Sequence, residues 1–176
     1  VKKNLELYCV HAKPSRKVFT LPMLQILGHE VSLSPWTGKK KQVFWTACVI
    51  GFFGSIRMGE ILCLEKNKFN PNETFLWSDV KFRDDGSILL KLKITKSKQV
   101  QGEYIDLFPN DEFNPCPVKC LKKLFSMRGE GETDFTPVFS LSNKEFFTVY
   151  DLNLNLRYTL EKHIGNKALE YSGHSL

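Results

Sequence analysis

Residues 83–96 read RDDGSILLKLKITK, a turn followed by a strand pattern. The run Asp84-Asp85-Gly86 is a hairpin turn signal. From Ile88 to Thr95 apolar residues alternate with polar ones, so the apolar side chains would face one way and the lysines between them the other. This stretch therefore predicts a β-hairpin whose second strand has one buried face.

Other elements flank this hairpin. Strand patterns at Thr74–Val80 and Tyr104–Leu107 extend it to a sheet of about three antiparallel strands. Helical patterns lie on both sides of the sheet region: one from Gln42, one that begins at Pro117, and one capped by Thr148 and ended by Gly165. The expected fold class is mainly α with a small three-stranded antiparallel β-sheet (α+β).

Composition narrows the function classes. The 176 residues fit one domain, and 25 Lys and Arg against 19 Asp and Glu give a net charge of +6, which favours a polyanionic partner. The five cysteines are odd in number and irregularly spaced, so we expect free thiols and no metal site. No apolar run is long enough for a membrane span and no signal peptide is recognisable, so we expect no membrane partner and no secretion.

Arg57 is the first candidate for chemistry. It follows an apolar helical run, and Ser55 before it is a plausible N-cap for the turn that holds Glu60. Arg57 could simply pair with Glu60 across one helical turn. Alternatively, its guanidinium faces a cleft and clamps a phosphate while Glu60 holds it in place. In either case we expect Arg57 to be largely buried.

Two further candidates are basic. Lys96 lies in a polar loop between two strands, close to Lys93 and Lys98, where it could contact a phosphate or could simply be solvated. His174 follows a glycine at residue 173, and a lone histidine is more often structural than catalytic. The run Lys39, Lys40 and Lys41 is basic as well, and such a run is usually a solvated face.

Taken together, these segments resemble the tyrosine recombinases, also called the phage integrase family. The family pattern is Arg-x-x-Glu-apolar on a helix, a lysine in a β-hairpin, and Gly-His-x-x-Arg. In this chain the pattern is matched in order by RMGEIL at 57–62, KLKITKSK at 91–98 and GHSL at 173–176. The resemblance spans residues 37–176. WSDV at 77–80 and GHSL at 173–176 look closer to recombinases of eukaryotic mobile elements than to bacterial chromosome-dimer resolvases.

The resemblance implies a metal-free and cofactor-free reaction on double-stranded DNA. A tyrosine attacks the scissile phosphate and forms a 3′-phosphotyrosyl link, which a 5′-hydroxyl later reverses. By position, Arg57 is the first phosphate-clamping arginine and Glu60 supports it. Lys96, or less well Lys98, is the general acid, and His174 is the histidine of the third motif. Lys39, Lys40, Lys41, Lys93 and Lys98 are expected to contact DNA.

The chain also departs from this pattern. The five tyrosines all precede His174, so none stands where the family has its nucleophile, and the second arginine would be residue 177. We therefore expect residues 37–176 to be a catalytic domain truncated before the end of its active site, inactive as it stands. Residues 1–36 would be a linker or a remnant of an amino-terminal DNA clamp.

The family pattern further implies a synaptic tetramer in the full-length protein. It also implies a nuclear location if the source is eukaryotic and a cytoplasmic one otherwise. Two alternatives stay open: a recombinase-derived module that binds DNA without cutting it, and a protein-interaction domain whose basic charge is incidental. The salt dependence of DNA binding distinguishes the protein-interaction alternative, because binding through phosphate contacts weakens steeply as the salt concentration rises.

Overall fold

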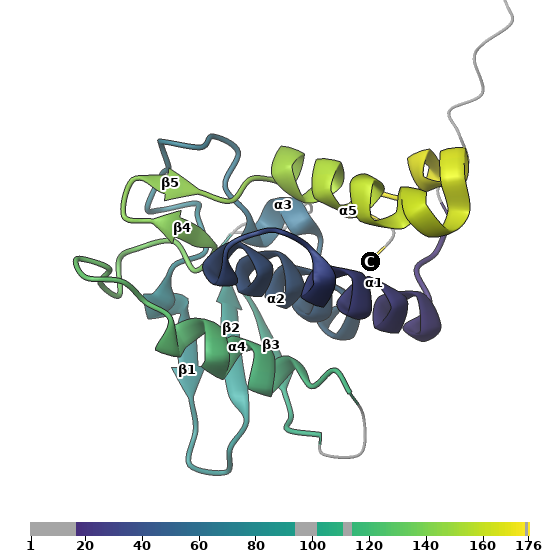
Figure 1. The fold of residues 1–176 in the computed structure, drawn as a ribbon. Coiled ribbons are helices and arrows are strands. Elements are labelled where there is room, and N and C mark those ends of the chain that lie inside the picture. Colours follow the sequence, from purple (N-terminus) through teal and green to yellow (C-terminus); the bar gives the residue numbers. More distant parts are fainter. Residues whose placement is uncertain (1–16, 94–101, 111–113, 175) are drawn as a thin grey trace, which may run out of the picture.

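The computed structural model describes residues 17–93, 102–110, 114–174 and 176. It is mainly helical with a small three-stranded antiparallel sheet, as the sequence predicts (Figure 1). The elements are, in chain order, α1 (Leu21–Leu33), α2 (Gly38–Gly54), α3 (Met58–Ile61), the 3-10 helix η3 (Trp77–Asp79), β1 (Val80–Phe82), β2 (Ile88–Leu92), β3 (Glu103–Leu107), α4 (Pro117–Ser126), β4 (Ser140–Ser142), β5 (Glu145–Phe146), α5 (Val149–Ile164) and the 3-10 helix η4 (Gly165–Glu170).

Helix α2 is the central element. Thr37 caps its start, because the threonine hydroxyl accepts a hydrogen bond of 3.3 Å from the Lys40 N–H. Ser55 ends it in the left-handed region at φ 50°, and its N–H bonds to the carbonyl of Gly51. The prediction that Ser55 starts the next turn is therefore wrong, because its backbone closes α2 and Arg57 is the N-cap of α3.

The three-stranded sheet has the order β1-β2-β3, and both pairings are antiparallel. Gly86 supports the tight turn between β1 and β2 with φ 83°, a conformation that favours glycine. The buried face of β2 is apolar, and Lys91 on the same strand points outward, which confirms the predicted alternation for residues 88–92. Ile94 and Thr95 lie outside the described residues. The first strand begins later than predicted, at Val80, because the Asp79 carboxylate accepts the Leu76 N–H at 2.9 Å and closes the η3 turn.

The residues at their first turns explain where helices α4 and α5 begin. Pro117 is the first residue of α4, where its missing N–H costs no hydrogen bond. Thr148 and Asp151 form a capping box at the start of α5: each side chain accepts the other residue's N–H at 3.1 Å. Both helix starts were predicted, whereas the short β4–β5 hairpin was not.

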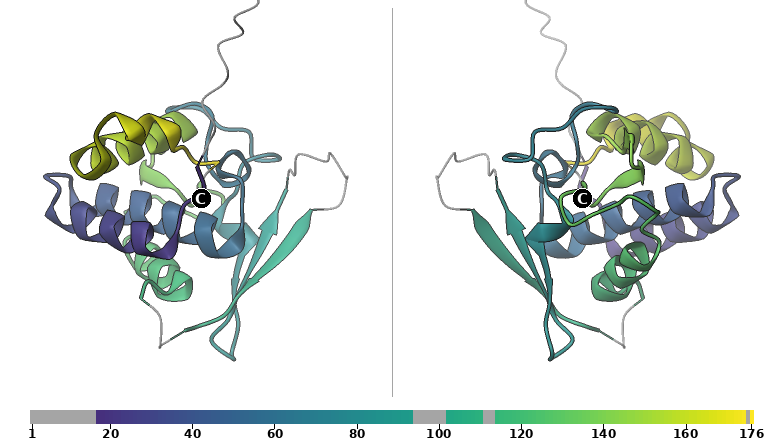
Figure 2. Two further views of the ribbon diagram at one scale, coloured as in Figure 1. Left: turned by 90° about the vertical axis from the view of Figure 1, so that its right-hand side faces the viewer. Right: turned by 90° about the vertical axis from the view of Figure 1, so that its left-hand side faces the viewer.

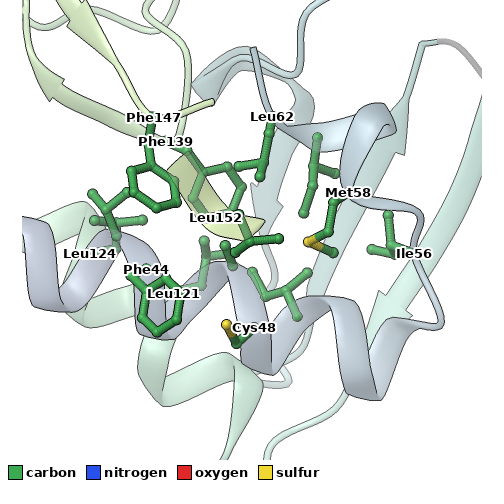
Figure 3. Close-up of a cluster of buried hydrophobic side chains, with 14 of the residues drawn as sticks. Phe44, Cys48, Ile56, Met58, Leu62, Leu121, Leu124, Phe139, Phe147 and Leu152 are labelled. Carbon is green, nitrogen blue, oxygen red and sulfur yellow. The ribbon is translucent and has the colours of Figure 1, made fainter. Parts of the chain in front are cut away.

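Packing around α2 makes the core. Helix α5 lies on one side of α2 and α4 on the other, with the three-stranded sheet beside them (Figure 2). Residues 42–51 of α2 are all buried except Trp45. Figure 3 shows Phe44 and Cys48 of α2 among Leu121 of α4, Phe139 before β4 and Leu152 of α5. The core therefore joins elements from both ends of the chain.

Helix α1 belongs to the same core, since it buries Leu24, Leu27 and Val31 and packs against α2 and α5. The expected boundary at residue 36 stays a prediction. Among the described residues, no helix is both long enough and apolar enough to cross a membrane.

Candidate functional site

The arginine turn, residues 57–60, is held by its own residues. The Arg57 N–H donates to Glu60 Oε2 at 3.3 Å, and the Glu60 N–H donates to the Arg57 carbonyl at 2.8 Å. The Arg57 guanidinium forms an ion pair with Glu60 Oε1 at 3.2 Å. This confirms the pairing expected from the i, i+3 spacing.

Burial of Arg57 was predicted, and that prediction is wrong. Its side chain is 55% exposed, whereas the Glu60 side chain is 11% exposed. The reason is the extended backbone of Arg57 at φ −68° and ψ 130°, which turns its side chain away from those of its neighbours. Ile56 and Met58 enter the core instead (Figure 3), so the guanidinium is presented to solvent on a rigid base.

The histidine segment, residues 172–174, lies against the arginine turn. A Cβ added at Gly173 would lie 2.6 Å from Met58 Cγ and 2.9 Å from Leu152 Cδ2, so only glycine fits in this contact. The Gly173 N–H donates to Asn153 Oδ1 at 2.8 Å. The fold thus brings the residue next to Arg57 into contact with the residue before His174, and the His174 side chain is exposed.

Lys93 differs from its expected role at the DNA surface. Its ammonium donates to the carbonyls of Pro71 and Thr74, each at 2.9 Å, and pairs with Asp79 Oδ2 at 2.7 Å. Its side chain is only 17% exposed. With all three donors used, Lys93 ties the end of β2 to the 71–79 segment and has no N–H left for a phosphate. Lys96 and Lys98 lie outside the described residues, so their roles stay predictions.

The basic run at residues 39–41 is not the solvated face that the sequence suggests. Lys39 donates to the Met127 carbonyl at 2.9 Å and pairs with the nearly buried Glu132 at 3.3 Å. Lys40 lies over the Trp36 ring, 4.8 Å from its centroid, and Lys41 donates to the Ser32 carbonyl at 2.8 Å. Lys39 is thus engaged with the 127–132 loop, and Lys40 and Lys41 with residues 32–36 before α2.

Among the described residues, no group of three or more His, Cys, Asp or Glu is placed to hold a metal ion. Burial raises the pKa of Cys63 and of Cys120 to about 12, and it also raises the pKa of Cys48. These three thiols therefore stay protonated near neutral pH and are poor nucleophiles.

Sequence reasoning missed the residues that support the site. Asn153 holds the histidine segment, and Asp79 both closes the η3 turn and binds Lys93. It also missed a hollow of about 630 Å³ beside Glu60, which extends to Lys68 and Phe69. No pattern in the sequence predicts the Asn153–Gly173 and Asp79–Lys93 contacts, because the partners are more distant in the chain than one turn of a helix.

Comparison with solved structures finds a similar fold in a DNA recombinase. The FLP recombinase, solved in a Holliday junction complex, aligns with a TM-score of 0.50 and 11% sequence identity. The alignment covers 86% of this chain and 36% of the recombinase chain, so this chain spans well under half of that protein's length. No family model and no curated protein sequence matches. The arrangement of helices and sheet described above is therefore similar to that of part of a tyrosine recombinase.

Proposed function

We propose that this chain is part of the catalytic domain of a tyrosine recombinase, which binds duplex DNA and, in the whole protein, cuts and rejoins its strands. The observation that carries the proposal is the contact between the arginine turn and the histidine segment at Met58 and Gly173. Two weak motifs that are far apart in the sequence meet in one place. The fold in which they meet is also similar to that of a DNA recombinase.

The geometry suits phosphate binding. One guanidinium nitrogen of Arg57 contacts Glu60, and more than half of the side chain is exposed to a ligand. Because Glu60 holds the turn, Arg57 could receive a nonbridging phosphate oxygen with little reorganisation. His174, exposed on the adjoining segment, would donate to the same phosphoryl group.

The nucleophile and the general acid of the proposed reaction are residues other than Arg57 and His174. In the proposed reaction the nucleophile is a tyrosine of the whole protein that follows residue 176. It attacks phosphorus, forms the 3′-phosphotyrosyl bond and expels the 5′-oxygen, which takes its proton from Lys96. We further propose a synaptic tetramer for the whole protein, and a nuclear location if its source is eukaryotic.

Adduct formation tests the catalytic part of the proposal. A longer chain from the same reading frame, which carries the downstream tyrosine, is incubated with a nicked suicide duplex and resolved on a denaturing gel. We expect a covalent protein–DNA band that Arg57→Ala and Lys96→Ala suppress and Lys122→Ala, on the exposed face of α4, leaves intact. Residues 1–176 alone should give no band.

Duplex binding separates the alternatives. Nonspecific binding through phosphates should have a dissociation constant on the order of 10⁻⁴–10⁻⁶ M at physiological salt and should weaken as salt rises. Salt-dependent binding without an adduct from the longer chain would identify a module that binds DNA and does not cut it. Absence of any salt-dependent binding would leave the protein-interaction alternative.

A further inference from the structure

A second hollow, of about 700 Å³, lies between the 67–69 loop and the β4–β5 hairpin. We call it the hairpin hollow. Two lysines, two asparagines and two phenylalanines line it: Asn67, Lys68, Phe69, Asn143, Lys144 and Phe146. No carboxylate is among them. The hairpin hollow is therefore a positively charged depression.

Several contacts hold its two walls together. The Phe146 N–H donates to the Lys66 carbonyl at 2.7 Å, and the rings of Phe69 and Phe146 pack edge to face with centroids 5.1 Å apart. With its amide nitrogen turned toward the acceptors, the Asn67 side chain bonds to the carbonyls of Lys66 and Lys144 at 3.2 Å each. Lys68 and Lys144, far apart in the sequence, are thus placed on one surface.

The ammonium groups of Lys68 and Lys144 are available to a ligand. Both residues are exposed, and within the described part of the chain neither forms an ion pair. Lys39 and Lys93 differ in this respect, because carboxylates and carbonyls inside the protein already bind their ammonium groups. An exposed pair of lysines in a hollow that no carboxylate lines favours an anion such as a phosphodiester.

The hairpin hollow adjoins the hollow that reaches Glu60 of the arginine turn. The 630 Å³ hollow beside Glu60 shares Lys68 and Phe69 with it. Three acids, Glu60, Glu65 and Glu73, line that first hollow together with one lysine, so it is less suited to a phosphate than the hairpin hollow. Anion binding is therefore favoured at the hairpin hollow, and separately at Arg57.

We propose that Lys68 and Lys144 bind a backbone phosphate of the duplex, away from the phosphate held at Arg57. The inference rests on the proposed function and adds a contact that the sequence did not suggest. Such a contact positions the duplex and carries no sequence information. It also replaces the contacts that had been expected from Lys39 and Lys93.

Salt titrations of duplex binding test the site. The double variant Lys68→Ala/Lys144→Ala is compared with Lys122→Ala/Lys123→Ala, which removes the same charge from the exposed face of α4, on the other side of α2 from α5 (Figure 2). Fluorescence anisotropy gives the dissociation constant at several salt concentrations. Each lost phosphate contact should reduce the log–log salt slope by about 0.9 and weaken binding about eightfold at 0.1 M salt.

We expect that loss for the hairpin double variant and much less for the α4 double variant. Lys68→Arg/Lys144→Arg should restore binding, and thermal melts should show all three variants folded, because the four lysines are exposed. Equal weakening by the two alanine doubles would overturn the site and leave the proposed function standing. If the unmodified chain shows no salt-dependent duplex binding, the proposed function itself fails.

Discussion

The two halves of the candidate site are held in different ways. The arginine turn is closed by hydrogen bonds between Arg57 and Glu60, three residues apart. The histidine segment depends on partners from elsewhere, since Gly173 packs against Met58 and Leu152 and bonds to Asn153. The hydrogen bonds of the first half are local, whereas those of the second form only when the helices around it have packed.

Truncating Leu152, which packs under the histidine segment, should have the largest effect on stability. Leu152 is fully buried in α5, directly under Gly173. Leu152→Ala should lower the free energy of unfolding by about 2–5 kcal/mol, because it deletes buried methyl groups and leaves a cavity. Urea denaturation measures this loss. Leu154→Ala, on the exposed face of the same helix, is the matched control and should cost under about 1 kcal/mol; equal losses would contradict this packing.

Crowding the histidine segment should have the next largest effect. Gly173→Ala places a methyl group against Met58 Cβ and Cγ, atoms too close to the backbone to move freely. We expect a loss of about 1–3 kcal/mol, as for overpacked cores. Gly59→Ala is the control, since nothing lies within 4 Å of its added Cβ.

A double-mutant cycle sharpens this result. In a Met58→Ala background the methyl group at residue 173 has room, so Gly173→Ala should cost less there than in the unmodified chain. Additive losses would mean that the two segments do not touch.

Disrupting the hydrogen bonds of the arginine turn should lower the free energy of unfolding by a smaller amount. Glu60→Ala removes the acceptor of the Arg57 N–H and of its guanidinium. A lost capping interaction of this kind lowers the free energy of unfolding by about 0.5–2 kcal/mol. Glu65→Ala, an exposed acid five residues on, serves as the control in thermal melts. A smaller loss for Glu60→Ala than for the control would refute the capping role.

Arg57→Ala should have the smallest effect on stability. The side chain is 55% exposed, so its ion pair is worth at most about 0.5 kcal/mol once solvent screening is counted. Duplex binding should nevertheless weaken, since the proposed phosphate donor is gone. If Arg57→Ala destabilises the protein as much as Glu60→Ala and leaves duplex binding unchanged, Arg57 only stabilises the turn and does not bind DNA.

The lysines show where sequence reasoning failed. A basic run at residues 39–41 and a lysine next to a strand suggested surface contacts, but Lys39 and Lys93 are bound internally. Lys68 and Lys144, which looked unremarkable in the sequence, form one positively charged hollow. Charge is visible in a sequence, whereas the acceptors that neutralise it come from segments that only folding brings near.

The sequence by itself determined the fold class, the hairpin turn at Gly86, the capping box at Thr148 and the pairing of Arg57 with Glu60. Each depends on residues at most a few positions apart, so periodicity and cap chemistry suffice to predict it. Only the tertiary structure decided that Arg57 is exposed, that Gly173 meets Met58, and which lysines are free to bind a ligand. These outcomes depend on packing between distant segments, and no local pattern encodes which of two neighbouring side chains the core will accept.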